Sequence, residues 1–370
     1  MFKRFIALFL AVGMCLSFGM TVLAAENTNN DLVTQAVTMI LQGIATEPEG
    51  YGLKSSDFEN MALGARLPAY RLDGETVEEI TDIEYYPLMS GSRATAIVTV
   101  VYDEDNTPVA QISKGFAAEM YHEAESDAIA LVFCDGNVSV YNGVSLTELN
   151  STAAWKVENY AVYNNIDLNG VERQYITPEV SLTLEHIPQT KAAPVTINVP
   201  QVKQNAKDSC WAACITSIAG YYGITTTIDR VYDIAGVVKY EGASVYDIFD
   251  TLFYPPFELE PEYYLSRATS CMSYGTIQSF VDSGRPLVGC INYPPDEDGR
   301  IKGHALVIRG YYLYTNSTSY AGSISYMNPY SGYYEASNVK KSGSRPYIYT
   351  DSSGAELGKI ENFVAIRKFK

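Results

Sequence analysis

The sequence predicts an α+β protein built from two globular parts that follow a short leader. Helical patterns and strand patterns fall in separate runs of the chain instead of alternating, which is typical of α+β folds. The 345 residues (370 − 25) that follow the leader also exceed the usual size of one domain. We place the first part at residues 26–190 and the second at residues 191–370.

Residues 1–25 have the features of a secretory signal peptide. Lys3 and Arg4 precede a long apolar run, and the small residues Ala24 and Ala25 mark the expected cleavage point. The apolar run is long enough to suggest an uncleaved anchor, but a polar segment follows it where a stop-transfer pattern would be needed. We therefore expect a secreted, extracellular protein that is free of the membrane after cleavage.

Composition restricts the partners. The net charge of −17, with no basic patch to offset it, argues against nucleic acid and anionic membranes. The thirty tyrosines suit half-buried strand positions or an aromatic groove, and composition does not decide between them.

The cysteines indicate a free thiol. Five remain after the leader (6 − 1), an odd number that points to a reactive sulfur. A pairing of Cys271 with Cys290 stays open on the sequence. We expect no metal site, because no C-x-x-C pair exists. We also expect no cofactor.

The first part reads as a helix packed on an antiparallel sheet. Residues 31–45 carry apolar side chains on a helical period with Asp31 as the cap. Strand-forming runs separated by Asp, Asn and Gly turns follow at 95–102, 108–114, 128–134 and 138–143. Residues 151–187 read as a connector, and the proline-spaced stretch 188–200 as an exposed segment with Lys191 as a processing point.

The second part predicts a helical half followed by a β-rich half. The expected helices begin at Cys210 and cover 229–235, 244–253 and 276–282, with Ser244 as a cap and Gly284 as a stop. The expected strands cover 285–293, 304–314, 323–328, 345–350 and 361–369. A helical lobe and an antiparallel β lobe are therefore expected side by side.

The most informative stretch is QNAKDSCWAACITSIAGYYG, residues 204–223. Asp208 and Ser209 are good N-cap residues, so Cys210 falls in the first helical turn. The unpaired N–H groups and the positive dipole end there favour a thiolate, which is a nucleophile. Cys214, one turn later, reads as a buried apolar side chain. Gln204 lies six residues (210 − 204) before Cys210, where its amide can help a backbone N–H bind an oxyanion.

A base and an orienting group follow downstream. His304 opens the strand-forming run HALVIRGYYLY and shares a face with Leu306 and Ile308. Asn328 ends another short run, directly before Pro329. Read singly, His304 is an ordinary histidine at a strand end, and Asn328 is an ordinary turn residue.

Together, Gln204, the Ser209-Cys210-Trp211 sequence, the His304-Ala305 pair and Asn328 resemble the papain-like cysteine peptidases. The similarity is to the compact bacterial members, of the streptopain, staphopain and bacteriocin-leader-peptidase type. It implies a two-lobe catalytic domain with a cleft, a Cys210-His304-Asn328 triad, an oxyanion hole at Gln204, and a protein or peptide substrate. It also implies that the N-terminal domain is an inhibitory propeptide of a zymogen. A permanently attached binding domain is the alternative.

The chain departs from the plant and lysosomal papain pattern. His304 and Asn328 follow Cys210 by 94 (304 − 210) and 118 (328 − 210) residues, where that pattern has about 130–150. Lys207 and Asp208 replace a Cys-Gly pair, and Tyr330 stands where a tryptophan is usual and could screen the His–Asn hydrogen bond. Two other functions stay open on the sequence: a transglutaminase-like acyltransferase, and a non-catalytic, tyrosine-rich extracellular binding protein.

Overall fold

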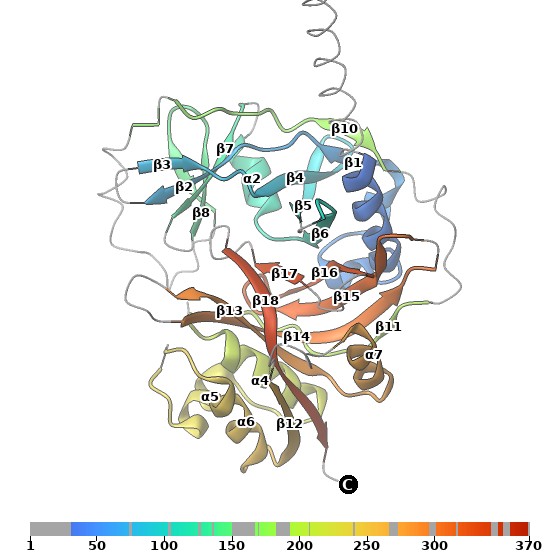
Figure 1. Ribbon diagram of the computed structural model, residues 1–370. Helices are drawn as coiled ribbons and strands as arrows, with labels where there is room; N and C mark the ends of the chain where they lie inside the picture. Colours follow the sequence, from blue (N-terminus) through green and yellow to red (C-terminus); the bar gives the residue numbers. More distant parts are fainter. Residues whose placement is uncertain are drawn as a thin grey trace, which may run out of the picture.

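The computed structural model describes residues 31–368 except 74–75, 103–104, 125–126, 135–136, 150–166, 169, 183–192, 207, 240, 266–272, 296–300, 316, 342–346 and 351–355. The expected signal peptide, the processing point at Lys191 and Cys271 lie outside these residues. Figure 1 shows the N-terminal part above the C-terminal part, with the long strand β18 (Glu356–Lys368) running through the lower one.

The N-terminal part contains a helix at 31–44 and two short 3-10 helices, η1 (Pro48–Tyr51) and η2 (Ser55–Asn60). Its strands and its second α-helix are β1 (Met61–Gly64), β2 (Ala69–Asp73), β3 (Thr76–Glu79), β4 (Ile83–Ser90), β5 (Arg93–Tyr102), β6 (Pro108–Ser113), α2 (Ala117–Ala124), β7 (Ala130–Cys134), β8 (Asn137–Tyr141), β9 (Leu146–Glu148) and β10 (Pro178–Ser181).

The C-terminal part begins with the short strand β11 (Val195–Thr196). The remaining elements, in order, are α4 (Cys210–Tyr221), α5 (Ile228–Ala235), α6 (Val245–Phe253), β12 (Leu259–Leu265), α7 (Tyr274–Asp282), β13 (Leu287–Pro295), β14 (Ile301–Leu313), β15 (Tyr320–Asn328), β16 (Tyr333–Lys340), β17 (Tyr347–Thr350) and β18. The predicted helices precede most of the strands, but β11 before α4 and β12 between α6 and α7 were not predicted and interrupt the expected helical half.

Local signals explain the helix ends. Ser244 caps α6 through a reciprocal capping box with Asp247, as its sequence position predicts. At α4 the N-cap residue is Ser209, but its hydroxyl makes no cap bond to the helix. It binds the preceding loop instead, accepting from the Ala206 N–H at 2.9 Å. Ser209 therefore fixes the loop before Cys210 more than the helix itself.

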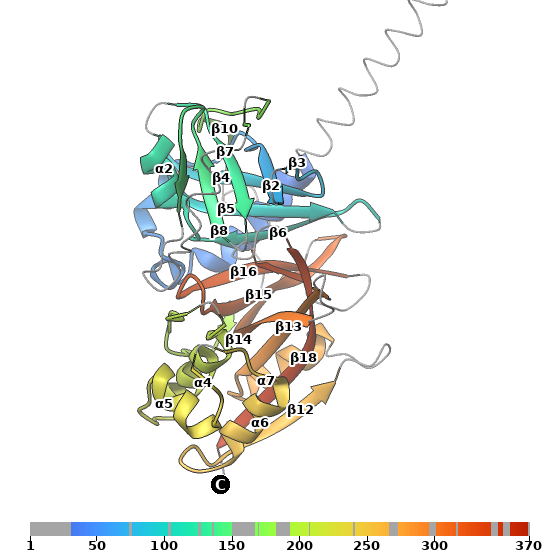
Figure 2. The same ribbon diagram turned by 90° about the vertical axis from the view of Figure 1, so that its left-hand side faces the viewer.

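One large sheet joins the two parts. Its strand order is β10-β1-β4-β5-β6-β16-β15-β14-β13-β18-β12, with β11 paired to β14 and β17 to β18. The join is the antiparallel pair β6–β16, where Ala336 lies opposite Ile112 and Ser337 opposite Gln111. Figure 2 shows β6 directly above β16 and β15. Strands from the two parts therefore share hydrogen bonds and a common register.

The expectation of one helix on one sheet in the N-terminal part is incomplete. The helix at 31–44 is present and packs in one core with β1, β4, β5, β6 and the C-terminal strands. A second, five-stranded sheet, β3-β2-β7-β8-β9, includes the parallel pair β2–β7 and encloses a second core with α2. Local patterns missed β4 and β16, because Pro87 interrupts the first and Glu, Ser and Asn interrupt the second.

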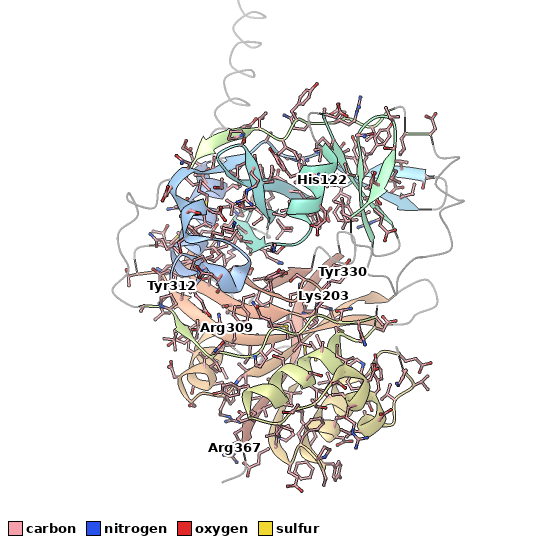
Figure 3. All side chains as sticks on the ribbon, turned by 180° about the vertical axis from the view of Figure 1, so that it is seen from behind. His122, Lys203, Arg309, Tyr312, Tyr330 and Arg367 are labelled. Carbon is pink, nitrogen blue, oxygen red and sulfur yellow. The ribbon has the colours of Figure 1, made fainter. Side chains whose placement is uncertain are left out.

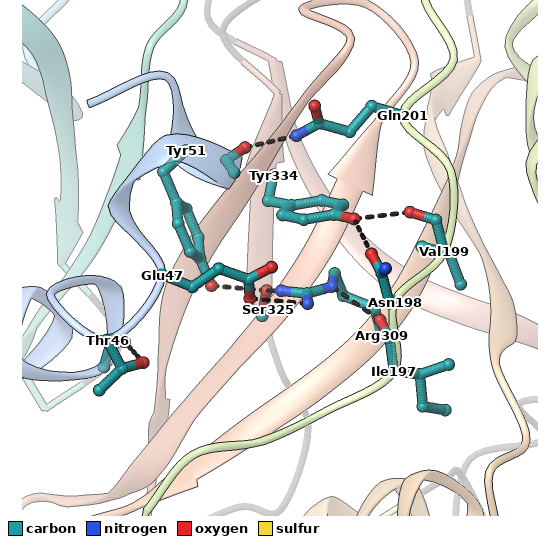
Figure 4. A network of polar contacts seen from close by, with 12 residues as sticks. Thr46, Glu47, Tyr51, Ile197, Asn198, Val199, Gln201, Arg309, Ser325 and Tyr334 are labelled. Atoms are coloured by element: carbon teal, nitrogen blue, oxygen red, sulfur yellow. Dashed lines mark hydrogen bonds and ion pairs between the residues drawn. The ribbon is translucent and has the colours of Figure 1, made fainter. Parts of the chain in front are cut away.

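A buried arginine ties the two parts together on one face of this sheet (Figure 4). Arg309 of β14 is 1% exposed and forms an ion pair with Glu47, whose carboxylate lies 2.9 Å from Nη2. Its Nη1 donates to Ser325 at 3.2 Å, and the Tyr51 hydroxyl donates to the same serine at 2.7 Å. The guanidinium also stacks on the ring of Tyr334 at 3.8 Å. Segment 47–51 thus neutralises a charge that the C-terminal part buries.

Among the described residues, no helix combines the length and the apolar character needed to cross a membrane.

Replacing Glu47 by Ala should lower the free energy of unfolding by about 1–2 kcal/mol. Breaking a fully buried ion pair costs about 3–5 kcal/mol, but water reaches the Glu47 side chain, which is 40% exposed, and compensates for some of the loss. Urea unfolding of the full chain measures the change. Lys239→Ala is the matched control, because its 3.9 Å pair with Asp229 is about half exposed on both sides. Equal effects from both variants would contradict the role of Arg309 as a joint between the parts.

Candidate active site

Cys210 is the first residue of α4 and lies against the start of β14. The side chain is buried, with 8% of the residue exposed. The sulfur receives a backbone hydrogen bond from Ala305, the residue that follows His304. Helix α4 packs on β14, and Ala305 and Leu306 belong to the same core as Cys210. The structure therefore brings the beginning of α4 and the His304 end of β14 together.

His304 and Asn328 form a direct hydrogen bond. His304 Nε2 and Asn328 Oδ1 are 2.9 Å apart, with 8% and 1% of the two residues exposed. Strands β14 and β15 pair with Val307 opposite Met327. Because side chains alternate along a strand, His304 and Asn328 project from the same face of the sheet. The pairing of β14 with β15 thus brings together two residues that are far apart in the sequence.

The amide of Asn328 has one orientation that satisfies its neighbours. Its Oδ1 accepts from the Tyr330 backbone N–H at 3.1 Å, and its Nδ2 donates to Glu335 Oε2 at 3.0 Å. A carboxylate is an acceptor and a backbone N–H is a donor, so exchanging O and N would lose both bonds. Because Oδ1 faces the ring, the proton of a neutral His304 belongs on Nε2. Nδ1 then carries the lone pair.

Gln204 lies in the loop that leads to α4. It is 5% exposed, and its backbone N–H donates to the Pro329 carbonyl at 2.7 Å. This bond ties the loop to the turn after Asn328. The side-chain Nε2 donates to the Ala206 carbonyl at 2.9 Å, which uses one of the two amide hydrogens.

Burial determines the protonation states of Cys210 and His304. Desolvation raises the pKa of the Cys210 thiol to about 11, and the nearby Asp208 carboxylate acts in the same direction. Desolvation lowers the pKa of His304 to about 4, although the bond to Asn328 opposes this. The expectation of a thiolate favoured by the helix N-terminus does not hold for this state. The loss of water around the sulfur outweighs the helix dipole, so at neutral pH both groups are uncharged.

Sequence patterns missed Glu335, which the structure places beside Asn328. It is 1% exposed and lies on β16, which the sequence did not predict as a strand. The feature that marks Glu335 is its burial, since glutamate is rarely buried without a partner, and burial cannot be read from the sequence YYEASNVK. For Tyr330, the bond to Asn328 comes from the backbone, and the predicted screening by its ring stays a prediction.

Two further thiols near Cys210 are free. Cys214 is buried one turn along α4, as predicted, and burial raises the pKa of its thiol well above the usual value. Cys290 is a free, half-buried thiol on β13, opposite Ala305. Cys271, the partner that the sequence left open for it, lies outside the described residues. Within the described part of the chain, no group of three or more His, Cys, Asp or Glu side chains could hold a metal ion.

A cysteine at the start of a helix, packed against a strand that carries a histidine bonded to an asparagine, is the arrangement of papain-like cysteine peptidases. Residues 196–354 match the model of the Peptidase_C39 like family. This part of the chain is a cysteine peptidase domain of that family, in an α+β protein.

Two solved structures are similar to the chain, both with a TM-score of 0.27. One is described as a double glycine motif protease from an AMS/PCAT transporter in complex with the leader peptide; it is 15% identical over 48% of this chain and 98% of the other. The second is the active wild-type interpain A cysteine protease of Prevotella intermedia, 16% identical over 49% of this chain and 87% of the other. TM-scores this low describe no shared overall fold. No curated protein matches the chain.

The raised pKa of Cys210 predicts a steep pH dependence of alkylation in the intact chain. Iodoacetamide reacts with the thiolate, whose fraction rises about tenfold per pH unit below a pKa of about 11. Labelling of Cys210 should therefore be slow at pH 7 and accelerate about tenfold per unit up to pH 10. Mass spectrometry of the peptide that contains Cys210 measures the rate, with near-ultraviolet circular dichroism to monitor folding. A rate that stays level from pH 5 to pH 9 would show a preformed thiolate–imidazolium pair instead.

Proposed function

We propose that the protein is a cysteine endopeptidase that hydrolyses peptide bonds with Cys210, His304, Asn328 and Gln204. The observation that carries the proposal is the 2.9 Å bond between His304 and Asn328, next to the Ala305 backbone that bonds to the Cys210 sulfur. These residues lie within the segment 196–354 that matches the peptidase family. The substrate class is protein or peptide.

The chemistry is acyl transfer through a thioester. His304 Nδ1 takes the Cys210 proton, and the thiolate attacks the peptide carbonyl carbon. The resulting oxyanion is held by the Cys210 backbone N–H and the Gln204 amide. His304 then protonates the leaving amine, and the C–N bond breaks. Water, deprotonated by the same ring, hydrolyses the thioester and releases the acid and the thiol. Asn328 keeps Nδ1 directed to the reaction by accepting from Nε2.

We further propose that the chain is exported as a zymogen and that the N-terminal part is its intramolecular inhibitor. Two features support a latent state. The catalytic side chains are almost fully buried, and burial holds both members of the Cys210–His304 pair neutral. The N-terminal part is also fastened to the peptidase part by the β6–β16 pairing and by Arg309. On this proposal, activation is a change that hydrates Cys210 and His304.

Cys210→Ala should abolish hydrolysis of a denatured protein substrate, a loss on the order of 10⁴-fold or more in kcat/KM. His304→Ala should be similarly inactive because no base remains. His122→Ala is the control, since His122 is an exposed histidine on α2. Hydrolysis retained by Cys210→Ala would remove the proposal. If the wild-type protein joins an added amine to the substrate instead of hydrolysing it, the protein is an acyltransferase.

Gln204→Ala should lower kcat by about 10²–10³-fold with a small change in KM, because an oxyanion donor acts mainly in the transition state. Steady-state kinetics on a peptide substrate measure both constants. A rise in KM with unchanged kcat would place Gln204 in substrate binding.

Trimming between residues 188 and 200 should accompany activation. Mass spectrometry of the active form locates the trimming, and the pH dependence of Cys210 alkylation reports the ionisation of the thiol. We expect alkylation of trimmed material to become fast at neutral pH as the site is hydrated. Full activity of an untrimmed chain would favour the alternative, a permanently attached N-terminal domain.

A further inference from the structure

Four polar side chains lie in a row across four neighbouring strands of the large sheet. In strand order β6, β16, β15 and β14 they are Gln111, Glu335, Asn328 and His304. Gln111 is paired with Ser337, two residues from Glu335 on β16. Glu335 is paired with Tyr326, two residues from Asn328 on β15. Since residues two apart share a face, the register places all four side chains on one face.

The contacts along the row run from the N-terminal part to the catalytic pair. Gln111 Nε2 donates to Glu335 Oε2 at 3.2 Å, and Asn328 Nδ2 donates to the same oxygen at 3.0 Å. Ser331 donates to Glu335 Oε1 at 2.9 Å. These three neighbours all offer hydrogens, which an ionised carboxylate accepts without donating any. Gln111, Glu335 and Asn328 are each 1% exposed.

Glu335 holds the orientation of the Asn328 side-chain amide by accepting a hydrogen bond from its Nδ2. A buried N–H₂ group that loses its acceptor is strongly disfavoured, because no water replaces the lost bond. Without the carboxylate, Asn328 can recover an acceptor only by rotating, and rotation moves Oδ1 away from His304. The carboxylate therefore acts on the histidine ring through the asparagine.

The opposite face of the same strands carries a different set of contacts. Tyr334 precedes Glu335 on β16 and stacks with Arg309 on the side occupied by segment 47–51 (Figure 4). Asn338, also on that face, donates to the Ala36 carbonyl at 3.1 Å. The N-terminal part thus holds β16 from one face with residues 36–51 and reaches the catalytic row on the other face through Gln111. Figure 3, viewed from behind, shows Arg309 and Tyr330 where the two parts meet.

We propose that Glu335 is a positioning residue of the peptidase site. We also propose that the N-terminal part contributes to this positioning through Gln111, which binds the Glu335 carboxylate. Glu335 holds Asn328 with Oδ1 toward His304 and so selects the Nε2–H form of the ring. Gln111 holds the carboxylate in place. The proposal rests on the proposed function in assigning His304 and Asn328 to catalysis, but its structural content is independent of activity.

The test uses ¹⁵N-histidine labelling of the full chain, which contains three histidines. Nuclear magnetic resonance reports the tautomer of each ring, and His122→Ala and His186→Ala assign the other two signals. We expect His304 in the wild type as the Nε2–H form with a slowly exchanging proton. In Glu335→Leu both tautomers should appear, with exchange at least about tenfold faster, as expected when a buried amide is left unsatisfied.

Two further variants complete the design. Glu335→Gln should keep the Nε2–H form, because its carbonyl oxygen can accept from both Asn328 and Gln111. Asn338→Leu is the matched control: it removes buried hydrogen bonds from the same strand on the opposite face and should leave the His304 signal unchanged. A single Nε2–H form with wild-type exchange in Glu335→Leu would overturn the proposal. Should Glu335→Leu fail to fold, Gln111→Leu decides: faster exchange supports the proposal, and a wild-type rate overturns it.

Kinetics of the active form separate this proposal from the proposed function. Glu335→Leu should lower kcat about tenfold with KM within about twofold, since a misplaced imidazole slows the chemical steps and not binding. If Cys210→Ala is inactive while Glu335→Leu retains the wild-type kcat, only the positioning proposal fails. If Cys210→Ala retains activity, the peptidase proposal fails. The tautomer measurement then still tests whether Glu335 selects the Nε2–H form of His304.

Discussion

The antiparallel register of β14, β15 and β16 is the constraint on which the site depends. It places His304, Asn328 and Glu335 on one face of three adjacent strands, although they are separated by 24 (328 − 304) and 7 (335 − 328) residues in the chain. A shift of one residue in either pairing would turn the side chains of one strand to the opposite face. The His304–Asn328 bond therefore follows from backbone pairing, and helix α4 then needs only to bring Cys210 to the same strand end.

Burial has opposite consequences for structure and for chemistry at this position. It strengthens hydrogen bonds such as those of Asn328, because water no longer competes for the donors and acceptors. The same loss of water penalises a thiolate and an imidazolium, which raises the pKa of Cys210 and lowers that of His304. Cys210 and His304 are thus placed at the same strand end while their charged forms are suppressed. In such a state the side chains are well ordered, and the neutral thiol reacts slowly.

The continuous sheet lets the N-terminal part influence the peptidase part from both of its faces. On one face, Glu47 balances the buried charge of Arg309, which the C-terminal part could not bury alone at low cost. On the other face, Gln111 completes the shell around Glu335. Separation of the two parts would break the β6–β16 hydrogen bonds, the Arg309–Glu47 ion pair and the Gln111–Glu335 contact together.

The sequence alone determined the local elements and the chemistry of the residues. Helical periods, caps and strand-forming runs predicted α4 to α7, β13 to β15 and the helix at 31–44, and the order of Cys210, His304 and Asn328 indicated the peptidase class. It did not reveal β16 or Glu335, because glutamate, serine and asparagine lack strand preference and β16 is stabilised by its neighbours. Nor could it show the shared sheet, the Arg309 pair or the neutral Cys210–His304 pair. Those depend on which surfaces meet and how much water they exclude, and only tertiary packing decides that.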